Sequence, residues 1–488
     1  MLLRICLFYC LASLTLAAVP LKVLILTGSS DLPYHHWRET TACLREILLE
    51  SGRFEVWTNE EPCGIIPEAL TGYDAVVLNY NGPRWPAAAE SALESFVRQG
   101  KGLFAFHHAS YGAFFGQEFR EGKWQDGPVG AGWQAFPKMI GATWDPKKLG
   151  HARRWVFPVE WKTPTHPVSR QLPGMFMAND ELYHRLTLFP GVQVLADAHS
   201  PKELEGTGQR EPLIWANLYG KGRVFFTPMG HDAMALYQPG MINVIARGVE
   251  WAATGEVTLP PINPHHPSVS LKPIRMLVVT SGHGYPTALY GMLDSLPNVV
   301  WTHAASHEEA FASPPEKNYE VILLHDMHAQ TTQQTRARLK AFVEAGKGVI
   351  SLHHAIVNYT DWPWWYEEVT GGKYFVEAAA GHPASQYKED LEFLVKPAAG
   401  QENHPVLQGV GPLWVYDELY RNMWISPKVQ VLMETDSPEN DKPVVYIGPY
   451  PNARILYVQL GHSGHTMKHP GFRRLMQNAV EWTARQTN

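Results

Sequence analysis

The sequence predicts an α/β protein built from two tandem domains, each with a doubly wound, mainly parallel sheet. At 488 residues the chain is too long for a single hydrophobic core and suits two domains. Short runs rich in Val, Ile and Leu alternate with helical patterns, which is typical of βαβ units. An internal repeat supplies the third observation, because the two halves carry the same landmarks in the same order.

The repeat is clearest around a Gly-Lys-Gly turn. Residues 100–109 read GKGLFAFHHA, and residues 346–355 read GKGVISLHHA. The later landmarks, one from each half, are Gly150-His151 and Gly381-His382, His166-Pro167-Val168 and His404-Pro405-Val406, Asp180-Glu181-Leu182-Tyr183 and Asp417-Glu418-Leu419-Tyr420, Gly230-His231 and Gly461-His462, and Glu250-Trp251 and Glu481-Trp482. Chance does not place so many matches in one order, so we infer a duplicated unit.

Composition gives the boundaries of the two units. Residues 258–273 are rich in proline and predict a stiff linker between unit one (21–257) and unit two (274–488). Residues 1–18 contain Arg4, a short apolar run and two closing alanines, which predicts a signal peptide and an exported, periplasmic or secreted protein. An uncleaved anchor or a buried strand is the alternative. No other apolar run is long enough to cross a bilayer.

Each predicted element follows from apolar spacing. In unit one the expected order is a strand at 22–26, a helix with Leu44, Ile47 and Leu48 on one face, a strand at 75–78, and a helix with Leu93, Phe96 and Val97. The strand after the Gly-Lys-Gly turn ends at His107, or at His353 in unit two. Strands at 212–216 and 223–227 and a closing helix through Ile245, Val249 and Trp251 complete the unit.

Several classes of function are excluded by what the sequence lacks. The net charge is −6 and no Lys or Arg run occurs, so the sequence predicts no nucleic-acid partner. No G-x-G-x-x-G follows a first strand, which argues against a nucleotide cofactor. Histidine stands where a Ser or Cys nucleophile would follow the Gly-Lys-Gly strand, so thiol and serine mechanisms are not expected. Cys43 and Cys63 remain in the mature chain, either paired or free.

Histidines gather at the predicted carboxyl ends of strands, where open α/β sheets bind ligands. We expect catalytic groups at His107, His231, Asp180 and Glu181 of unit one and at His353, His462, Asp417 and Glu418 of unit two. The expected substrate-binding residues are Tyr34, His35, His36, His108, Tyr183, His283, Tyr285, His354, Asp361, Trp362, Trp364 and Tyr420. Imidazoles and carboxylates suit general acid and base work, and clustered aromatics suit stacking on a sugar ring.

Two alternatives stay open for these residues. The histidines and carboxylates could instead fix loops, and the aromatics could pack in the core. A divalent cation is a further alternative, although no H-E-x-x-H or Cys-pair spacing occurs and its ligands would have to come from distant loops.

Both units resemble the ThuA-like (trehalose utilisation) domain, which has a flavodoxin-like architecture related to class I glutamine amidotransferases without their thiol. The resemblance lies in the Gly-Lys-Gly strand with its histidines, the His-Pro pairs, Asp-Glu-Leu-Tyr, Gly-His and Glu-Trp. Unit two also carries the usual 361–364 (DWPW) and 371–375 (GGKYF), but departs from the family at Tyr285-Pro286-Thr287. Unit one keeps Tyr34-His35-His36 and lacks the Trp-Pro-Trp segment.

The resemblance implies carbohydrate metabolism, particularly of disaccharides oxidised to 3-keto forms. A ketone acidifies the adjacent C–H, so a histidine or carboxylate base could drive isomerisation or elimination of a glycosidic substituent. The expected partner is therefore a small carbohydrate or glycoside. A non-catalytic carbohydrate-binding or scaffolding protein and a metal-assisted ester or amide hydrolase are the alternatives.

Overall fold

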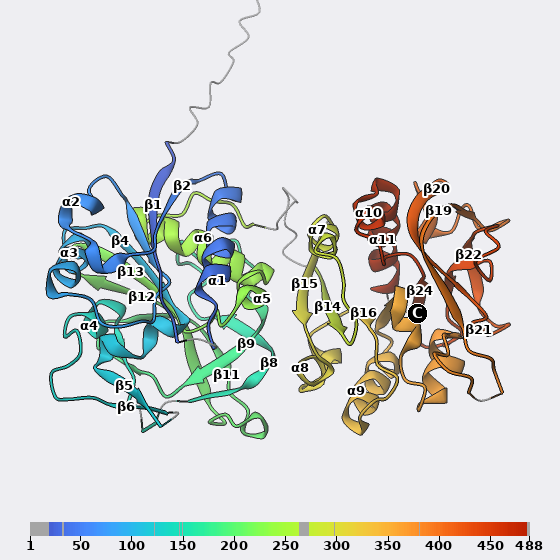
Figure 1. The fold of residues 1–488 in the computed structure, drawn as a ribbon, viewed down its shortest axis with the longest axis horizontal. Helices are drawn as coiled ribbons and strands as arrows, with labels where there is room; N and C mark the ends of the chain where they lie inside the picture. The colour runs from blue at the N-terminus through green and yellow to red at the C-terminus, as the bar shows by residue number, and fades with distance from the viewer. Residues whose placement is uncertain are drawn as a thin grey trace, which may run out of the picture.

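The computed structural model describes residues 19–31, 34–121, 123–145, 147–148, 150–262, 273–296, 298–379 and 381–485, so the predicted signal peptide lies outside the described residues. Two sheets of nine strands lie side by side, one in each unit (Figure 1). This is the predicted architecture of two α/β domains. Among the described helices, none combines the length and apolar character needed to cross a bilayer.

The sheet of unit one is half parallel and half antiparallel. Its order is β2 (Phe54–Asn59), β1 (Leu21–Leu26), β3 (Ala75–Leu78), β4 (Gly102–Phe106), β13 (Gly222–Thr227), β12 (Arg210–Tyr219), β11 (Gln193–His199), β8 (Gly150–Trp161) and β9 (Met175–His184). The first five strands are parallel, and the last four are joined by antiparallel pairs. The antiparallel half was not expected from the sequence.

Unit two repeats this sheet strand for strand. Its order is β15 (Val299–Ala304), β14 (Ile274–Ser281), β16 (Val321–Asp326), β17 (Gly348–Leu352), β24 (Ile455–Val458), β23 (Pro443–Ile447), β22 (Gln430–Glu434), β19 (Gln386–Pro397) and β20 (Leu413–Arg421). The shared order includes the antiparallel half, so the duplication covers the whole unit.

Helices cover both faces of each sheet because the parallel strands are apolar on both sides. In β1, Val23 and Ile25 pack with α1 (Trp37–Glu50) and α6 (Pro239–Thr254), whereas Leu24 and Leu26 pack with α3 (Ala87–Arg98). Unit two places α7 (Ala288–Asp294) and α11 (Pro470–Thr483) on one face, and α8 (His307–Phe311) and α9 (Gln333–Glu344) on the other.

The remaining elements are short. They are the helices α2 (Pro67–Leu70), α4 (Phe136–Ile140), α5 (Ala233–Leu236) and α10 (Gly464–Lys468), and the strands β5 (Gln117–Arg120), β6 (Lys123–Asp126), β7 (Ala142–Thr143), β10 (Thr187–Leu188), β18 (Gly372–Lys373) and β21 (Trp424–Ile425). Cys43 and Cys63 are both free cysteines; Cys43 is buried on α1 and Cys63 is exposed.

The units meet where α8 of unit two packs on β8 and β9 of unit one. Asn179 donates from Nδ2 to the carbonyl oxygen of His303 at 2.7 Å and to Glu309 Oε2 at 3.0 Å. Arg154 lies between the units, with Nη1 2.6 Å from Asp232 Oδ2 and Nε 3.6 Å from Glu309 Oε1. Polar groups of both units are therefore matched at this contact.

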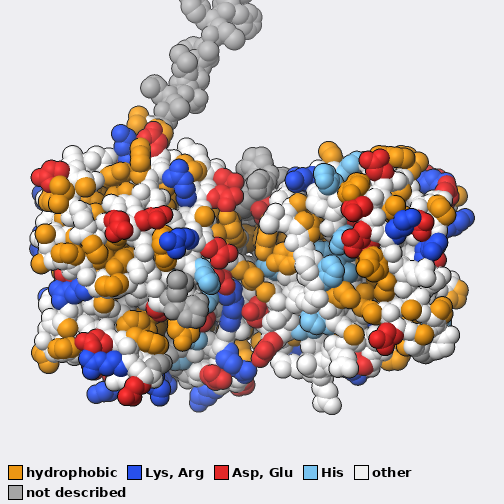
Figure 2. Space-filling model, in the orientation of Figure 1, with side chains coloured by type: hydrophobic (Ala, Val, Ile, Leu, Met, Phe, Trp, Pro, Cys, Tyr) orange, Lys and Arg blue, Asp and Glu red, His pale blue; other side chains and the backbone are white. Residues whose placement is uncertain are grey.

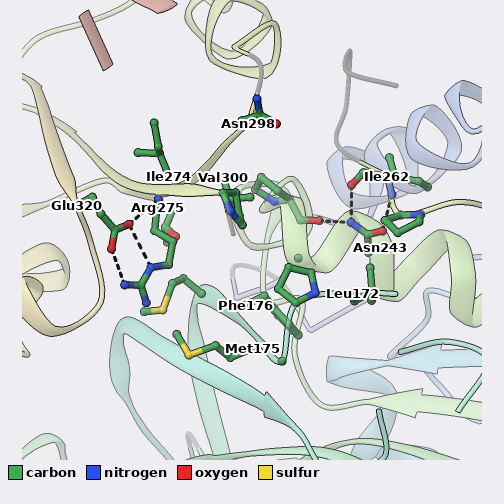
Figure 3. A pocket seen from close by; sticks show the side chains of 18 of the residues that line it. Leu172, Met175, Phe176, Asn243, Ile262, Ile274, Arg275, Asn298, Val300 and Glu320 are labelled. Carbon is green, nitrogen blue, oxygen red and sulfur yellow. Dashed lines mark hydrogen bonds and ion pairs between the residues drawn. The ribbon is translucent and has the colours of Figure 1, made fainter. Parts of the chain in front are cut away.

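A cavity of about 770 Å³ also lies between the units, lined mainly by apolar side chains such as Met175, Phe176 and Ile274. Figure 3 shows hydrogen bonds between some of its polar groups, with Arg275 turned toward Glu320 and Asn243 beside Ile262. The cavity is lined by none of the residues predicted for catalysis or substrate binding.

A buried arginine fastens the closing helix of unit one to the His-Pro loop. Arg247 is 1% exposed and donates to the carbonyl oxygens of Val168 at 2.7 Å, Pro167 at 2.9 Å and Arg170 at 2.9 Å, and also to Leu259. In unit two, Asn478 holds the closing helix to the His-Pro loop, donating to the carbonyl oxygens of Val406 at 3.1 Å and Gln408 at 2.8 Å. The repeated His-Pro-Val motif is thus an anchoring loop.

Replacing Arg247 by Met should lower the free energy of unfolding by about 3 kcal/mol, because buried carbonyl oxygens lose their donor. Urea denaturation monitored by fluorescence measures the change. Arg120→Met, at a side chain 59% exposed on β5, is the matched control and should change stability by no more than about 0.5 kcal/mol. Equal midpoints for the two variants would contradict this role for Arg247.

Candidate functional site

The two strand-end histidines share an unusual backbone conformation. His107 follows β4 with φ 42°, and His353 follows β17 with φ 52°. Left-handed backbone at a non-glycine residue costs of order 1 kcal/mol or more and is found where a side chain must be aimed. Both imidazoles are fully buried. The sharp turn after the Gly-Lys-Gly strand therefore directs each ring across the carboxyl edge of its sheet.

In unit one, side chains from three other segments gather around His107. His35 Nε2 lies 2.9 Å from His107 Nε2, and His231 Nδ1 lies 3.3 Å from the same atom. Glu181 Oε2, from β9, is 3.3 Å from His231 Nδ1. We call His35, His107, His231 and Glu181 the unit-one cluster. The predicted meeting of imidazoles at this edge is present in the structure.

Hydrogen bonds to the far side of two rings fix their protons. His107 Nδ1 lies 2.9 Å from the carbonyl oxygen of Pro228, which can only accept, so Nδ1 carries a proton. His35 Nδ1 likewise donates to Asp31 Oδ1 at 2.6 Å, and Tyr111 donates to the other oxygen of Asp31 at 2.5 Å. In their neutral forms both rings therefore turn Nε2 lone pairs toward each other. Two lone pairs at 2.9 Å repel unless a proton or a cation lies between them.

The charge state of the unit-one cluster is set by burial and by the carboxylate. Burial, together with the neighbouring histidines, holds the pKa of His107 well below its usual value, so its ring is neutral. Burial also lowers the pKa of His231, but the hydrogen bond and charge of Glu181 outweigh it and leave this pKa raised. For Glu181, burial raises the pKa, and the bond to His231 and the charges of His231 and His151 bring it below normal.

The unit-one cluster reaches solvent on the Glu181 side. The side chains of Glu181 and His231 are 17% and 21% exposed, and His151, 3.8 Å from Glu181, is 42% exposed. His107 and His108 lie beneath them and are fully buried. Tyr183 completes the floor, with its hydroxyl 3.3 Å from His107 Nε2, and burial raises its pKa well above normal. A small molecule would therefore meet Glu181, His231 and His151 first.

The aspartates of the two Asp-Glu pairs hold loops. Asp180 accepts from the backbone amides of Gly230 at 2.6 Å and Glu181 at 2.8 Å. Asp417 accepts from the amides of Gly461 at 2.8 Å, His462 at 3.0 Å and Ser463 at 2.9 Å. Because these carboxylates point at backbone amides, the geometry favours a positioning role for them over the catalytic role predicted from the sequence.

Unit two builds a different group around the equivalent histidine. His353 donates from Nδ1 to the carbonyl oxygen of Gln459, and its Nε2 is 2.8 Å from Glu418 Oε2 and 2.9 Å from the hydroxyl of Tyr420. The His462 ring stacks on His353 with centroids 5.1 Å apart. We call His353, Glu418, Tyr420 and His462 the unit-two cluster. Here Nε2 of His353 faces a carboxylate and a tyrosine hydroxyl instead of a second imidazole.

A second row of rings lies beside the unit-two cluster. His354 packs between His283 and His325, at centroid distances of 4.4 Å to each, and Tyr285 lies 6.3 Å from His325. Neither ring nitrogen of His354 has a hydrogen-bond partner among the described residues, and burial lowers its pKa. In unit one, His108 stacks on His35 in the same way at 4.9 Å. The second histidine of each pair therefore supports the first layer of rings.

Some predicted substrate-binding residues lie elsewhere. Tyr34 and His36 are exposed beside the buried His35. Asp361 pairs with Arg336 of α9, Trp362 stacks on Trp365 at 5.5 Å, and Trp364 lies under Lys340 at 5.8 Å. Trp362 and Trp364 are partly buried and pack against the hydrophobic core on the α9 side of the sheet, whereas Asp361 is exposed.

Further residues that were not predicted lie at these sites. Asp31, Tyr111 and His151 lie at the unit-one cluster, and His325 lies in the row of rings beside the unit-two cluster. His307, Asp326 and His328 form a separate group in unit two. A carboxylate four residues before His35 was a usable signal for Asp31. The others come from strands or loops whose neighbours depend on the sheet order.

Histidine side chains reach the face shown in both units (Figure 2).

Fold and site together define a tandem α/β protein with a cluster of histidines at the carboxyl edge of each sheet. A family model described as ThuA, trehalose utilisation, matches residues 22–252 and 287–483. The chain therefore belongs to the ThuA family, and each unit is one copy of its domain.

Solved structures give further likenesses. A ThuA-like protein from Parabacteroides merdae is 28% identical over 49% of this chain and 92% of its own, with a TM-score of 0.41. One from Bacteroides uniformis is 21% identical over 50% and 96%, with a TM-score of 0.39. A β-galactosidase from Rahnella sp. R3 is 17% identical over 48% and 31%, with a TM-score of 0.32. No curated protein matches the chain.

A buried lysine holds the loop that follows the unit-two histidines. Lys373 is fully buried and donates to the carbonyl oxygens of Val357 and, at 2.9 Å, Asn358. Burial lowers the pKa of Lys373 from the usual 10.5 to about 7, and the charge of Asp361 opposes this shift. Between these values the unfolded chain binds more protons than the folded one, so this lysine makes stability rise with pH.

We therefore expect the stability lost in Lys373→Met to grow between pH 7 and pH 9, by up to about 1.4 kcal/mol per pH unit. Urea denaturation of both proteins at each pH gives the difference. Lys388→Met, at a side chain 55% exposed, should show no such trend. A difference for Lys373→Met that is constant with pH would show that this lysine folds with an ordinary pKa.

Proposed function

We propose that the protein is an enzyme acting on a small carbohydrate, and that unit one holds its active site around a divalent cation bound by His35, His107 and His231. The ThuA family's description, trehalose utilisation, supports the substrate class. The observation that carries the proposal is the meeting of ring nitrogens in the unit-one cluster, with Nε2 of His35 and Nε2 of His107 2.9 Å apart.

The spacing of these nitrogens suits a metal ion. Zn–N bonds of about 2.1 Å in a tetrahedral site place two nitrogens roughly 3.3 Å apart. The observed separations from His107 Nε2 are 2.9 Å to His35 and 3.3 Å to His231. A single proton removes the repulsion between only one pair of facing nitrogens. A cation can be coordinated by the nitrogens of His35, His107 and His231 together.

The far sides of the rings have the support that metal-binding histidines use. Asp31 holds His35 through Nδ1 at 2.6 Å, and the Pro228 carbonyl holds His107 through Nδ1 at 2.9 Å. Such partners fix the tautomer and orient the ring toward an ion. In unit two the Gln459 carbonyl holds His353 through Nδ1 in the same way, but Nε2 of His353 faces Glu418 instead of a second imidazole.

The remaining residues suit proton transfer on a keto sugar. A bound cation would polarise a carbonyl oxygen of the substrate. Glu181, at the solvent side, would remove the proton from the carbon next to that carbonyl, and the electron pair would form an enolate. The enolate would then expel the glycosidic oxygen from the neighbouring carbon, and the protonated Glu181 would give that oxygen the proton that it took from carbon. The products would be an alcohol and an unsaturated keto sugar.

Metal binding is tested by a pair of adjacent histidines. The protein is first stripped of metal with a chelator and then dialysed to equilibrium against Zn²⁺, and the bound metal is measured by elemental analysis. His35→Ala should bind one Zn²⁺ per chain fewer than the wild type. His36→Ala, at the exposed neighbour, should bind like the wild type. Equal metal content in both variants would rule out the unit-one cluster as a metal site.

Catalysis is tested by the two equivalent carboxylates. With a 3-keto-glucoside as substrate, Glu181→Gln should lower the rate of aglycone release 100-fold or more, because the base is lost. Glu418→Gln, the same change in unit two, should keep most of the rate. A larger loss in Glu418→Gln would move the active site to unit two. Sugar binding without turnover by the metal-loaded wild type would support the non-catalytic alternative.

A further inference from the structure

Unit two has a second group of metal-binding side chains, separate from the unit-two cluster. His307 begins α8, Asp326 ends β16, and His328 follows two residues later. One ligand atom from each lies within 4.8 Å of the others. We call these three residues the switch-point cluster. None of them belongs to the residues predicted from the sequence or to the proposed active site.

The position of the switch-point cluster is favoured for ligands by topology. The chain runs from β14 outward to β15 and then returns past β14 to β16, so the strand order reverses between β14 and β16. Open α/β sheets bind ligands outside the carboxyl ends of the strands at this point. Ser281 and Asp326, the last residues of these two strands, are paired across it.

A set of neighbouring side chains holds the three groups in place. Asn358 donates from Nδ2 to Asp326 Oδ1 at 2.8 Å and accepts from the backbone amide of His328 at 2.7 Å. Ser281 Oγ lies 2.7 Å from His328 Nε2, and the Tyr359 hydroxyl lies 3.3 Å from His307 Nε2, the nitrogen that also faces Asp326. Asn358 and Ser281 thus hold Asp326 and His328 from outside the cluster, as outer partners of metal ligands do.

The burial of the switch-point cluster leaves one side open. Asp326 is 0% exposed, and His307 and His328 are partly exposed. Of the ion pairs found within the described ranges, the one that Asp326 makes is with His307 Nε2. A buried carboxylate needs a charge partner or a metal, and the exposed edges of the two imidazoles give an ion a path from solvent.

Unit one does not share the switch-point cluster. Val321 and Ala75 are equivalent, because they pair with the third residue of the first strand in their units, Met276 and Val23. Counting five residues on from each places Tyr80 of unit one at the position of Asp326. The Tyr80 hydroxyl donates to the carbonyl oxygen of Pro83 at 2.7 Å. The cluster therefore belongs to unit two alone and is independent of the duplicated His107 and His353 pattern.

We infer that the switch-point cluster binds a divalent transition-metal ion of the Zn²⁺ class through His307, Asp326 and His328. Two imidazoles and one carboxylate are the donor set of open, three-ligand sites for such ions. The remaining position faces the solvent side, where water or a small anionic or hydroxylated ligand can coordinate. This inference does not rest on the function proposed for unit one.

The test uses the full chain carrying His35→Ala, so that the unit-one cluster does not contribute. Equilibrium dialysis of this protein against Zn²⁺ should give one ion per chain, and Co²⁺ in its place should show the visible absorption of a low-symmetry site. Adding Asp326→Asn or His328→Ala should weaken binding tenfold or more. Asp326→Asn keeps the size of the side chain, and circular dichroism checks that each variant is folded.

Two controls separate this site from others. His465→Ala removes an exposed histidine on α10, and His462→Ala alters the unit-two cluster; neither should change Zn²⁺ binding in the His35→Ala protein. The inference is overturned if the His35→Ala protein binds no Zn²⁺, if Asp326→Asn and His328→Ala bind it unchanged, or if His462→Ala rather than His328→Ala abolishes binding.

Discussion

The constraint on which unit one depends is the fixed orientation of two imidazoles. The Pro228 carbonyl accepts a hydrogen bond from Nδ1 of His107, and Asp31 accepts one from Nδ1 of His35. The Nε2 atoms of the two rings therefore face each other at 2.9 Å. The left-handed backbone at His107 directs its ring toward His35. Such a conformation costs free energy, and the surrounding structure must hold it in place. Buried neutral rings that face each other in this way are stable only with a shared proton or an ion.

The duplication shows how one framework supports different sites. Both units retain the sheet order, the strained histidine and the aspartate that holds the Gly-His loop. Unit one adds His35 opposite His107, whereas unit two pairs His353 with Glu418 and gathers His307, Asp326 and His328 at another point of the same edge. Because loops at strand ends vary while the sheet is kept, such divergence costs the fold little.

Much of the fold followed from the sequence because apolar periodicity and repetition are local signals. The strand at 75–78 and the helix containing Leu93, Phe96 and Val97 lie where the spacing placed them. The antiparallel half was missed, since β8 and β9 carry no regular alternation of polar and apolar residues and their pairing is not specified by local sequence.

The site was predictable where strand ends carry histidine, as at His107 and His231, and where the repeat carries Asp-Glu, as at Glu181. Asp31 stands four residues before His35, a spacing that was not used, and the contact of His151 with Glu181 depends on the pairing of β8 with β9. Trp362 lies beside Arg336 of α9.

Anomalous diffraction from crystals soaked in Zn²⁺, recorded on either side of the zinc absorption edge, tests the central claim most directly. The account predicts an anomalous peak between the ring nitrogens of His35, His107 and His231, about 2 Å from each. A clear map in which these three rings keep their contacts with no peak between them would contradict it.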